Sequence, residues 1–407
     1  MAGEQLHRTP LPALSTTAPG HVPDVSTLSG VTGAWHRAMP FTRLVDCGMD
    51  PADARELLCV TAAGEDWSRT ATEIGDRQLR RARDADGVGH VITARAAARA
   101  AAGALNFAQL AHNTDTDAKR AAYDHYLEAM ALVVALCHGA VEEVALTYRQ
   151  GELRGWLCLP KGGRAEATVI VWGGLSGWGA TYLPTADALI QRGIACLLAE
   201  GPGQGTPRLH HRIYARPDTL AGFGRFLDYV AADPRLDGGI GIQGNSFGGL
   251  FAAHLAAADP RVAACVINGA PAIPAVPEFR SAREQILAVL GTDDLTEAAS
   301  LLAEMRFTPE HHTIDIPCLI LQGGADPLAT PQAQAPFAQT ARHPQSQMLT
   351  WPDGEHTLYN HSTERNAMTA DWFQDQLTSI GTKRTMPIDR APAADLLLDK
   401  PVQTLQK

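Results

Sequence analysis

Long apolar runs and an excess of positive charge are both missing from this sequence. No stretch of ~20 uninterrupted apolar residues occurs, so we expect no membrane-spanning helix. Residues 1–30 hold no apolar segment behind a basic start, and we therefore expect no secretory signal. Charged residues make up 19% of the chain and the formal net charge is −10, which argues against nucleic acid or an anionic membrane as the main partner.

The seven cysteines are scattered and form no C-x-x-C pair. Cys196 lies in the apolar run IACLLA and Cys318 in PCLIL, where free thiols behave as small hydrophobic side chains. This pattern is typical of the reducing cytoplasm and makes disulfides and metal sites the less favoured interpretations. A nucleotide-binding loop is also absent, because the glycines of EGPGQG (200–205) fit neither G-x-x-x-x-G-K-[ST] nor G-x-G-x-x-G. We interpret that segment as a structural turn.

Proline is absent between Pro51 and Pro160. Most of this interval is rich in Ala, Arg, Leu and Glu, and its apolar residues recur at three- and four-residue steps, as in 91–105. Asp50 followed by proline is typical of a helix start, with an N-cap before proline at the first helical position. We therefore expect a helical unit over residues 34–140, preceded by a flexible tail at 1–33 that is rich in Pro, Ser, Thr and Gly.

From residue 141 the pattern changes to short apolar runs that alternate with amphipathic helical stretches. The expected strands are 141–148, 154–159, 167–174, 194–200, 239–246, 261–269, 317–324 and 346–351, and the expected helices are 182–192, 216–232, 247–258, 330–341 and 362–378. Strands buried on both faces and joined by helices indicate a mostly parallel, doubly wound α/β sheet over 141–380. Residues 270–313 break the rhythm and predict an excursion over the sheet, and 381–407 predict a C-terminal tail.

The strongest local signal is G-N-S-F-G, centred on Ser246 between an expected strand and the helix 247–258. G-x-S-x-G in this context is a nucleophile elbow, a turn so sharp that the serine backbone is strained and its Oγ stands clear of the sheet. The flanking glycines remove Cβ atoms that would collide in the turn. The alternative is a glycine-rich turn with a capping serine. The strand–turn–helix context favours Ser246 as a nucleophile.

A serine hydroxyl is a poor nucleophile near neutral pH, so a base and an acid should follow it in the chain. Asp326 follows the expected strand 317–324, and His356 follows the expected strand 346–351. Each lies beyond the carboxyl end of a strand, where open α/β sheets place their sites, and the order Ser, Asp, His fits the elbow motif. We predict that His356 accepts the serine proton and that Asp326 orients the imidazole.

A tetrahedral intermediate also needs N–H donors for its oxyanion. One donor is expected from the backbone N–H of Phe247, at the start of the helix after the elbow. The other is expected from the loop GGLSG (173–177), where Leu175 or Gly174 would supply the N–H. Ser176 lacks the elbow spacing, and we interpret it as loop structure.

These motifs together resemble the 2,6-dihydroxypseudooxynicotine hydrolase group of the α/β-hydrolases, which includes fungal pigment-pathway hydrolases. The resemblance covers about 60–380 and rests on the helical unit, GGLSGW, EGPGQG, GNSFGG, GGADPL and GEHTLYN. It implies an α/β-hydrolase fold with a helical, cap-like N-terminal domain over the active site. It also implies a cytoplasmic homodimer without a metal or organic cofactor. The group often has Asp where Glu200 stands and an acidic residue where Thr206 stands, so this chain departs from it there.

Members of that group cleave carbon–carbon bonds in 1,3-diketone-like compounds, or esters and thioesters. The resemblance therefore implies a serine hydrolase of secondary metabolism for a small, largely apolar carbonyl compound. Carbon–carbon cleavage in the nicotine enzyme also uses a glutamate, and Glu278 occupies roughly that region. Trp178, Tyr182, Phe251 and Phe279 are further pocket candidates, although core packing is the commoner role of such aromatics.

Two other interpretations stay open at this stage. An acyltransferase or cyclase would use the same nucleophile, because the difference from hydrolysis is the exclusion of water by the cap. A binding protein on a retained hydrolase fold would need no turnover, although the intact motifs speak against it.

Overall fold

The structure is a computed structural model that describes residues 24–378. Residues 1–23 of the expected tail (1–33) lie outside the described residues. The remaining part of that tail contains helical segments. Asp24 accepts a hydrogen bond from the Ser26 N–H and so caps a short 3₁₀ helix, η1 (Val25–Thr27). Helix α1 then begins at Gly30, before the expected boundary. The expected C-terminal tail at 381–407 lies outside the described residues.

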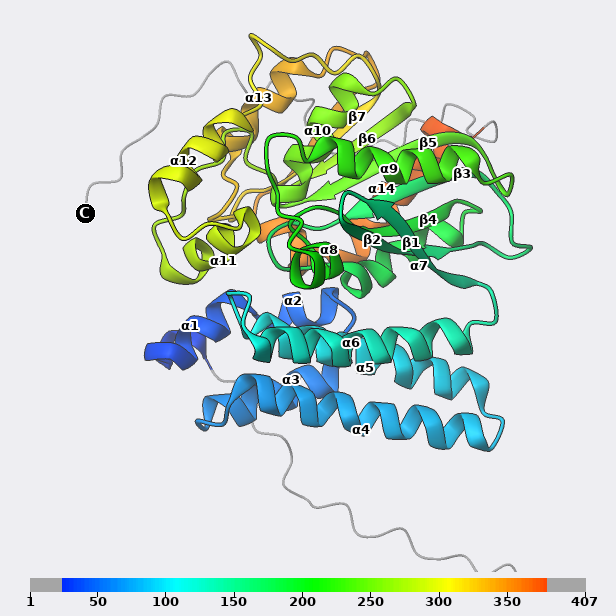
Figure 1. Cartoon of the computed structure of the whole chain (residues 1–407), viewed down its shortest axis with the longest axis vertical. Helices are drawn as coiled ribbons and strands as arrows, with labels where there is room; N and C mark the ends of the chain where they lie inside the picture. The colour runs from blue at the N-terminus through cyan, green and yellow to red at the C-terminus, as the bar shows by residue number, and fades with distance from the viewer. Residues whose placement is uncertain (1–23, 379–407) are drawn as a thin grey trace, which may run out of the picture.

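Six helices form the N-terminal unit: α1 (Gly30–Ala38), α2 (Phe41–Asp46), α3 (Pro51–Ala62), α4 (Trp67–Gly87), α5 (Val91–Leu110) and α6 (Asp117–Leu136). Asp50 caps α3 by accepting from the Ala52 N–H, with Pro51 at the first position as the sequence predicts. The repeated small residues of α5 are buried, including Ala94, Ala98 and Ala101. Figure 1 shows these helices as a separate layer against the sheet-containing unit.

Eight strands form one sheet in the order β1-β2-β4-β3-β5-β6-β7-β8. They are β1 (Val141–Tyr148), β2 (Gly151–Cys158), β3 (Ala165–Trp172), β4 (Ala195–Glu200), β5 (Leu236–Asn245), β6 (Val262–Asn268), β7 (Cys318–Gly323) and β8 (Gln347–Trp351). Strand β2 is antiparallel to its neighbours β1 and β4, and all other neighbouring pairs are parallel. The expected mostly parallel α/β sheet is therefore confirmed, and every residue of β4 and β7 is buried.

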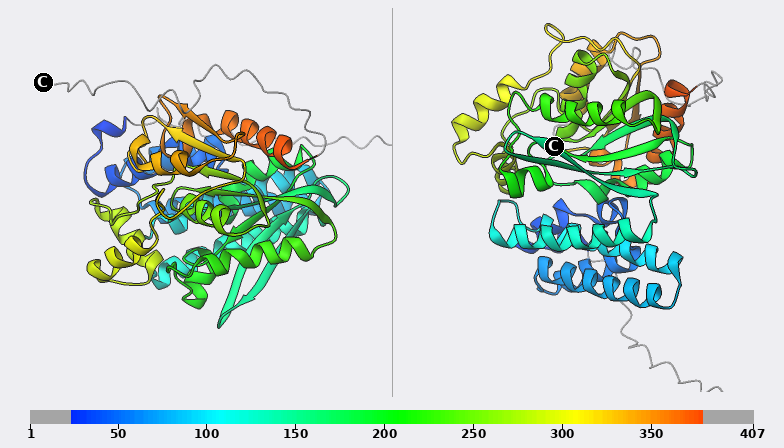
Figure 2. Two further views of the ribbon diagram at one scale, coloured as in Figure 1. Left: turned by 90° about the horizontal axis from the view of Figure 1, so that it is seen from above. Right: turned by 45° about the vertical axis from the view of Figure 1, so that its right-hand side comes forward.

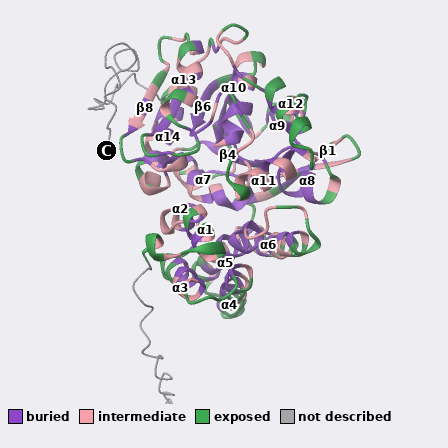
Figure 3. Cartoon of the chain, turned by 90° about the vertical axis from the view of Figure 1, so that its left-hand side faces the viewer, coloured by how far each residue is buried: buried purple, intermediate pink, exposed green. Residues whose placement is uncertain are grey.

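Helices cover both faces of the sheet and form a core on each side. The elements are η2 (Gly179–Tyr182), α7 (Leu183–Ile190), α8 (Gly205–His211), α9 (Leu220–Ala232), α10 (Phe247–Ala258), α11 (Arg280–Leu290), α12 (Leu295–Glu304), α13 (Pro331–Thr340), η3 (His356–His361) and α14 (Ser362–Leu377). The views of Figure 2 show α14 and α9 on opposite sides of the strands, and Figure 3 shows the strands as the buried interior.

Three of these helices were not expected from the sequence. Helix α8 follows the EGPGQG segment, and its pattern was hidden by Gly205 at its start and Pro207 inside its first turn. Helices α11 and α12 occupy the excursion 270–313. The Gln285 side chain of α11 donates to Asn113 Oδ1 at 2.9 Å, so the excursion contacts the loop between α5 and α6. Among the helices of residues 24–378, none has the length and hydrophobicity needed to cross a bilayer.

Candidate active site

Ser246 lies in a strained turn between β5 and α10. Its backbone has φ 54° and ψ −134°, a conformation that non-glycine residues rarely adopt. A Cβ on Gly244 would lie 2.2 Å from the carbonyl oxygen of Gly248, and one on Gly248 would lie 2.1 Å from that of Gly173. Both glycines are therefore required by close backbone contacts. The turn is the tight strand-to-helix connection that the G-x-S-x-G pattern predicts.

A continuous chain of hydrogen bonds joins the three residues of the predicted triad. His356 Nε2 lies 2.8 Å from Ser246 Oγ, and His356 Nδ1 lies 2.8 Å from Asp326 Oδ2. The Asp326 side chain is fully buried, and its Oδ1 accepts from the backbone N–H groups of Leu328 and Ala329 at 2.8 and 3.0 Å. These bonds hold the carboxylate toward the imidazole. Three strand ends, those of β5, β7 and β8, thus meet at one point.

The loop after β3 lies directly beside the nucleophile. A Cβ on Gly174 would lie 3.0 Å from Ser246 Oγ and 3.0 Å from the backbone nitrogen of Phe247. The loop is tied down by Gln204, whose Nε2 donates to the Gly173 carbonyl at 2.5 Å and whose Oε1 accepts from the Gly201 N–H at 3.0 Å. The EGPGQG segment therefore has a structural role next to the site, because its glutamine fixes the start of the loop.

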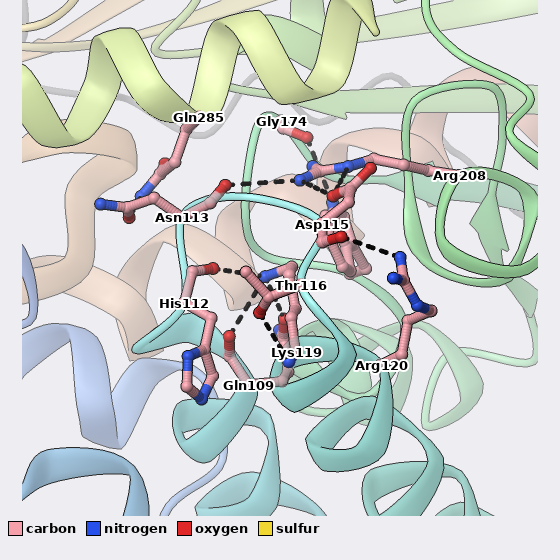
Figure 4. A network of polar contacts seen from close by, with 11 residues as sticks. Gln109, His112, Asn113, Asp115, Thr116, Lys119, Arg120, Gly174, Arg208 and Gln285 are labelled. Atoms are coloured by element: carbon pink, nitrogen blue, oxygen red, sulfur yellow. Dashed lines mark hydrogen bonds and ion pairs between the residues drawn. The ribbon is translucent and has the colours of Figure 1, made fainter.

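The loop after β3 is also held by Trp178, whose ring contacts the helical unit. Trp178 Nε1 donates to the Gly174 carbonyl at 3.3 Å. Two cations lie over the Trp178 ring, Lys119 of α6 at 5.3 Å and Arg208 of α8 at 5.5 Å. Figure 4 shows Arg208 paired to Asp115 from the α5–α6 loop, and Lys119 bonded to Gln109 and to His112 at the start of that loop. Packing of the helical unit thus orders the backbone beside Ser246.

A cavity of about 640 Å³ opens onto Ser246 and His356. Its wall is formed by residues of the helical unit, the loop after β3, the excursion and the loops that carry the triad: Ala34, Arg37, Ala38, Pro40, Arg43, Asp46, Cys47, Gly174, Leu175, Ser176, Gly177, Thr181, Tyr182, Asn245, Ser246, Phe279, Arg280, Ser281, Ala282, Gln285, Ala325, Pro327, Leu328, Glu355, His356, Thr357, Tyr359 and Arg365. A cavity of this size fits a small organic molecule.

The structure brings only some of the predicted pocket residues to this cavity. Tyr182 and Phe279 line it. Trp178 does not, because its ring is buried against the helical unit. Phe251 is also a core residue, in contact with Phe247. Glu278 is exposed and lies outside the cavity wall. The chain enters α11 just after it, and Phe279 and Arg280 line the cavity instead.

The contribution of helix α2 was missed by sequence reasoning. Asp46 forms a buried two-point ion pair with Arg365, at 2.6 and 2.9 Å, and Arg365 also donates to the Thr357 carbonyl at 2.7 Å. Thr42 donates to Glu355 Oε2 at 2.5 Å. Helix α2 therefore holds the residues on either side of His356. Thr42 and Asp46 lie one helical turn apart in FTRLVD, which predicts a shared face but not what that face contacts.

Glu200, at the end of β4, is a fully buried acid outside the cavity wall. Its Oε2 accepts from the Tyr123 hydroxyl and from the Thr206 N–H, and its Oε1 has no hydrogen-bond partner among the described residues. Burial raises the pKa of this carboxyl to about 7, against the lowering effect of the Tyr123 and Thr206 bonds and the charge of Arg154. Among residues 24–378, no group of three or more His, Cys, Asp or Glu side chains is placed to hold a metal ion.

Comparisons with known proteins agree with this fold. The sequence model of the Prolyl oligopeptidase family matches residues 188–379. The crystal structure of a 2,6-dihydroxy-pseudo-oxynicotine hydrolase superposes with a TM-score of 0.73 at 21% identity, covering 84% of this chain and 97% of that one. These matches show that the chain has the α/β-hydrolase fold.

Curated relatives of the chain include bacterial and fungal hydrolases. The 2,6-dihydropseudooxynicotine hydrolase of Paenarthrobacter nicotinovorans is 26% identical over 246 residues, which are 56% of this chain and 62% of that protein. The hydrolyase poxO of Penicillium oxalicum is 32% identical over 150 residues, 34% of this chain and 35% of that protein. The chain thus spans less than two thirds of the length of each of these relatives.

Proposed function

We propose that this α/β-hydrolase is a serine hydrolase that cleaves an acyl bond of a small, largely apolar carbonyl compound. The observation that carries the proposal is the hydrogen-bond chain from Ser246 through His356 to Asp326, with 2.8 Å at each link, at the floor of a 640 Å³ cavity. This arrangement of nucleophile, base and buried acid is the one that acyl transfer through serine requires.

In this mechanism, Ser246 Oγ attacks the substrate carbonyl while His356 Nε2 takes the hydroxyl proton. Asp326 keeps Nδ1 protonated and stabilises the imidazolium that forms. The Phe247 N–H and an N–H of the loop at Gly174 or Leu175 bind the oxyanion. The imidazolium then protonates the leaving group, and a water molecule, activated by the same imidazole, hydrolyses the acyl-enzyme.

The cavity wall supports the choice of a largely apolar substrate. Leu175, Phe279, Pro327 and Leu328 line the cavity and offer carbon surface to the body of the ligand. Esters, thioesters and 1,3-diketones share the electrophilic carbonyl that this site would attack. The names of the relatives favour a hydrolase, and the bacterial relative is named for a nicotine-derived substrate.

The test is labelling with a fluorophosphonate probe followed by a panel of esters, thioesters and 1,3-diketones. We expect a stoichiometric adduct on the wild-type protein and none on Ser246→Ala, which should keep its thermal midpoint because the change removes a single oxygen atom. Labelling that persists in Ser246→Ala, or a wild type that neither labels nor turns over any substrate, would refute the proposal. Product analysis with added amines and alcohols separates hydrolysis from acyl transfer.

We further propose that the protein acts in the cytoplasm as a homodimer, as the family resemblance implies. The buried thiols of Cys158, Cys196, Cys265 and Cys318 fit a reducing compartment. Light scattering of the purified full chain, at micromolar concentration, tests the dimer directly, since a monomeric mass of 43.4 kDa would contradict it.

A further inference from the structure

Arg43 of helix α2 is a charged residue of the cavity wall that the proposed mechanism does not use. It contacts both sides of the catalytic centre. Its Nη2 donates at 3.0 Å to the hydroxyl of Ser176, in the loop proposed to bind the oxyanion. Its guanidinium carbon lies 5.5 Å from the centre of the Tyr359 ring, and that ring packs edge-on at 6.0 Å against the imidazole of His356.

Arg43 forms no direct ion pair with a carboxylate among residues 24–378, although its charge interacts with the nearby Asp46 carboxylate, which is paired to Arg365. Its Nη1 donates to the Ala38 carbonyl at 2.7 Å, and its Nη2 donates to Ser176, so both partners are neutral oxygens. Its Nε is buried and has no hydrogen-bond partner among the described residues, although the neighbouring Cys47 thiol contacts the guanidinium. Arg43 is half-buried in the cavity wall, and partial removal of a cation from water without a direct carboxylate partner costs free energy that a bound anionic oxygen would offset.

The other charged groups deep in the cavity are already engaged. Asp46 gives both carboxylate oxygens to Arg365, and Glu355 accepts from Thr42. Arg280 lies at the exposed rim beside Glu284, and Arg37, the remaining arginine of the wall, is exposed as well. Arg43 is therefore the cation in the described part of the wall that combines a buried, unused N–H donor with a place next to the catalytic loops.

From these contacts we infer that Arg43 binds an anionic oxygen of the substrate and so determines specificity for the proposed hydrolase. The inference rests on the proposed function, because it assumes that the cavity holds an acyl substrate on Ser246. Arginine binds carboxylates and related oxygen anions through its planar fork of N–H groups. The ligand chemistry is a negatively charged oxygen, whether from a carboxylate or from the enolate of a 1,3-dicarbonyl compound.

The position of Arg43 defines where that oxygen would lie. With the reacting carbonyl at Ser246 and its oxygen toward Gly174, the Ser176 hydroxyl lies two residues farther along the same loop and Arg43 just beyond it. The anionic oxygen would thus lie a few bonds from the scissile carbonyl, on the side of the helical unit. The apolar wall at Phe279 and Leu328 would contact the rest of the molecule.

The experiment compares matched substrates in the wild type and in Arg43→Met. Nitrophenyl pentanoate is the neutral ester, and the mono-nitrophenyl ester of glutaric acid adds a carboxylate at a similar chain length. Benzoylacetone, assayed at a pH above its own pKa, supplies an enolate. We expect Arg43→Met to lower the ratio of kcat/KM for a charged substrate over the neutral ester by about 10- to 100-fold, the usual effect of losing a charge-assisted hydrogen bond. Arg43→Lys should retain part of the preference, because it keeps the charge but loses the fork.

Arg83→Met is the matched control, since Arg83 is an exposed arginine of α4 outside the cavity wall and its loss should leave every ratio unchanged. A fall confined to the glutarate ester identifies a carboxylate as the natural group, and a fall confined to benzoylacetone identifies an enolate. Equal ratios in wild type and Arg43→Met for both charged substrates overturn the inference. The neutral ester and the fluorophosphonate label test the proposed function separately, because neither needs an anionic oxygen.

If Arg43→Met fails to fold, the wild type alone still decides. Phenylbutanoate and phenylbutanamide, which differ in charge and little in shape, are compared as inhibitors of neutral-ester hydrolysis. We expect the carboxylate to bind at least about tenfold more tightly. Equal inhibition by the two compounds would also overturn the inference.

Discussion

Because the Glu200 carboxyl is buried, we expect the free energy of unfolding to depend on pH. Its folded-state pKa of about 7 lies above the ordinary value of 4.5, because the side chain is buried and one of its oxygens has no hydrogen-bond partner among the described residues. Between these two values the folded protein holds a proton that the unfolded chain has lost. The free energy of unfolding should therefore fall as pH rises through this window and level off above the folded pKa.

The interval between the two pKa values corresponds to about 3 kcal/mol of unfolding free energy. Glu200→Gln removes this term, because the amide is neutral at every pH and its oxygen can still accept from Tyr123 and Thr206. The variant should match the wild type near pH 5 and exceed it by up to about 3 kcal/mol near pH 8.

Urea unfolding followed by tryptophan fluorescence, at several pH values from about 5 to 8, measures this difference. Taking the difference between variant and wild type cancels the titration of all other groups. Glu128→Gln is the control, because Glu128 is exposed on α6, the helix that also carries Tyr123. A stability difference between Glu200→Gln and wild type that does not change across this range would refute the reasoning.

Three further predictions follow from the site and the ion pair that supports it. Asp326→Asn should lower kcat by about 10³- to 10⁴-fold in a neutral-ester assay while labelling slows in parallel, because the imidazole loses the partner of its Nδ1; an unchanged kcat would contradict the triad. Gly174→Ala should cost about 10²-fold in kcat with the fold retained by circular dichroism, since the new methyl would lie 2.8 Å from Ser246 Cβ and displace the loop. Asp46→Asn should destabilise the protein by about 3–5 kcal/mol in urea unfolding, because Arg365 keeps a buried charge without its partner; replacing both residues together, Asp46→Leu with Arg365→Met, should recover much of that loss.

Most of the sheet could be predicted from the sequence, because strand and helix patterns are local. The apolar runs of β4 and β7 and the glycine spacing around Ser246 each reflect an environment set by a few neighbouring residues. Asp326 and His356 could be chosen for the same reason, since each follows directly on a strand and parallel strands bring their carboxyl ends together.

The wall of the cavity could not be predicted in this way. Glu278 and Trp178 were proposed for it from sequence position, yet the course of the chain into α11 exposes the first and packing against α6 and α8 buries the second. Short elements such as α8 also carry too few residues for a periodic pattern, and Pro207 obscures what pattern there is.

The amino-acid sequence by itself determined the order of strands and helices along the chain and the strained serine turn, since each depends on neighbouring residues. It also indicated the two partners of the serine, because each follows directly on a strand. Only the tertiary structure decided that Arg43 and Asp46, roughly 200 residues before the nucleophile, reach its cavity, and that Glu200 does not. The physical reason is that burial and charge pairing are properties of surfaces that meet. No local sequence pattern predicts which surface the helical unit covers.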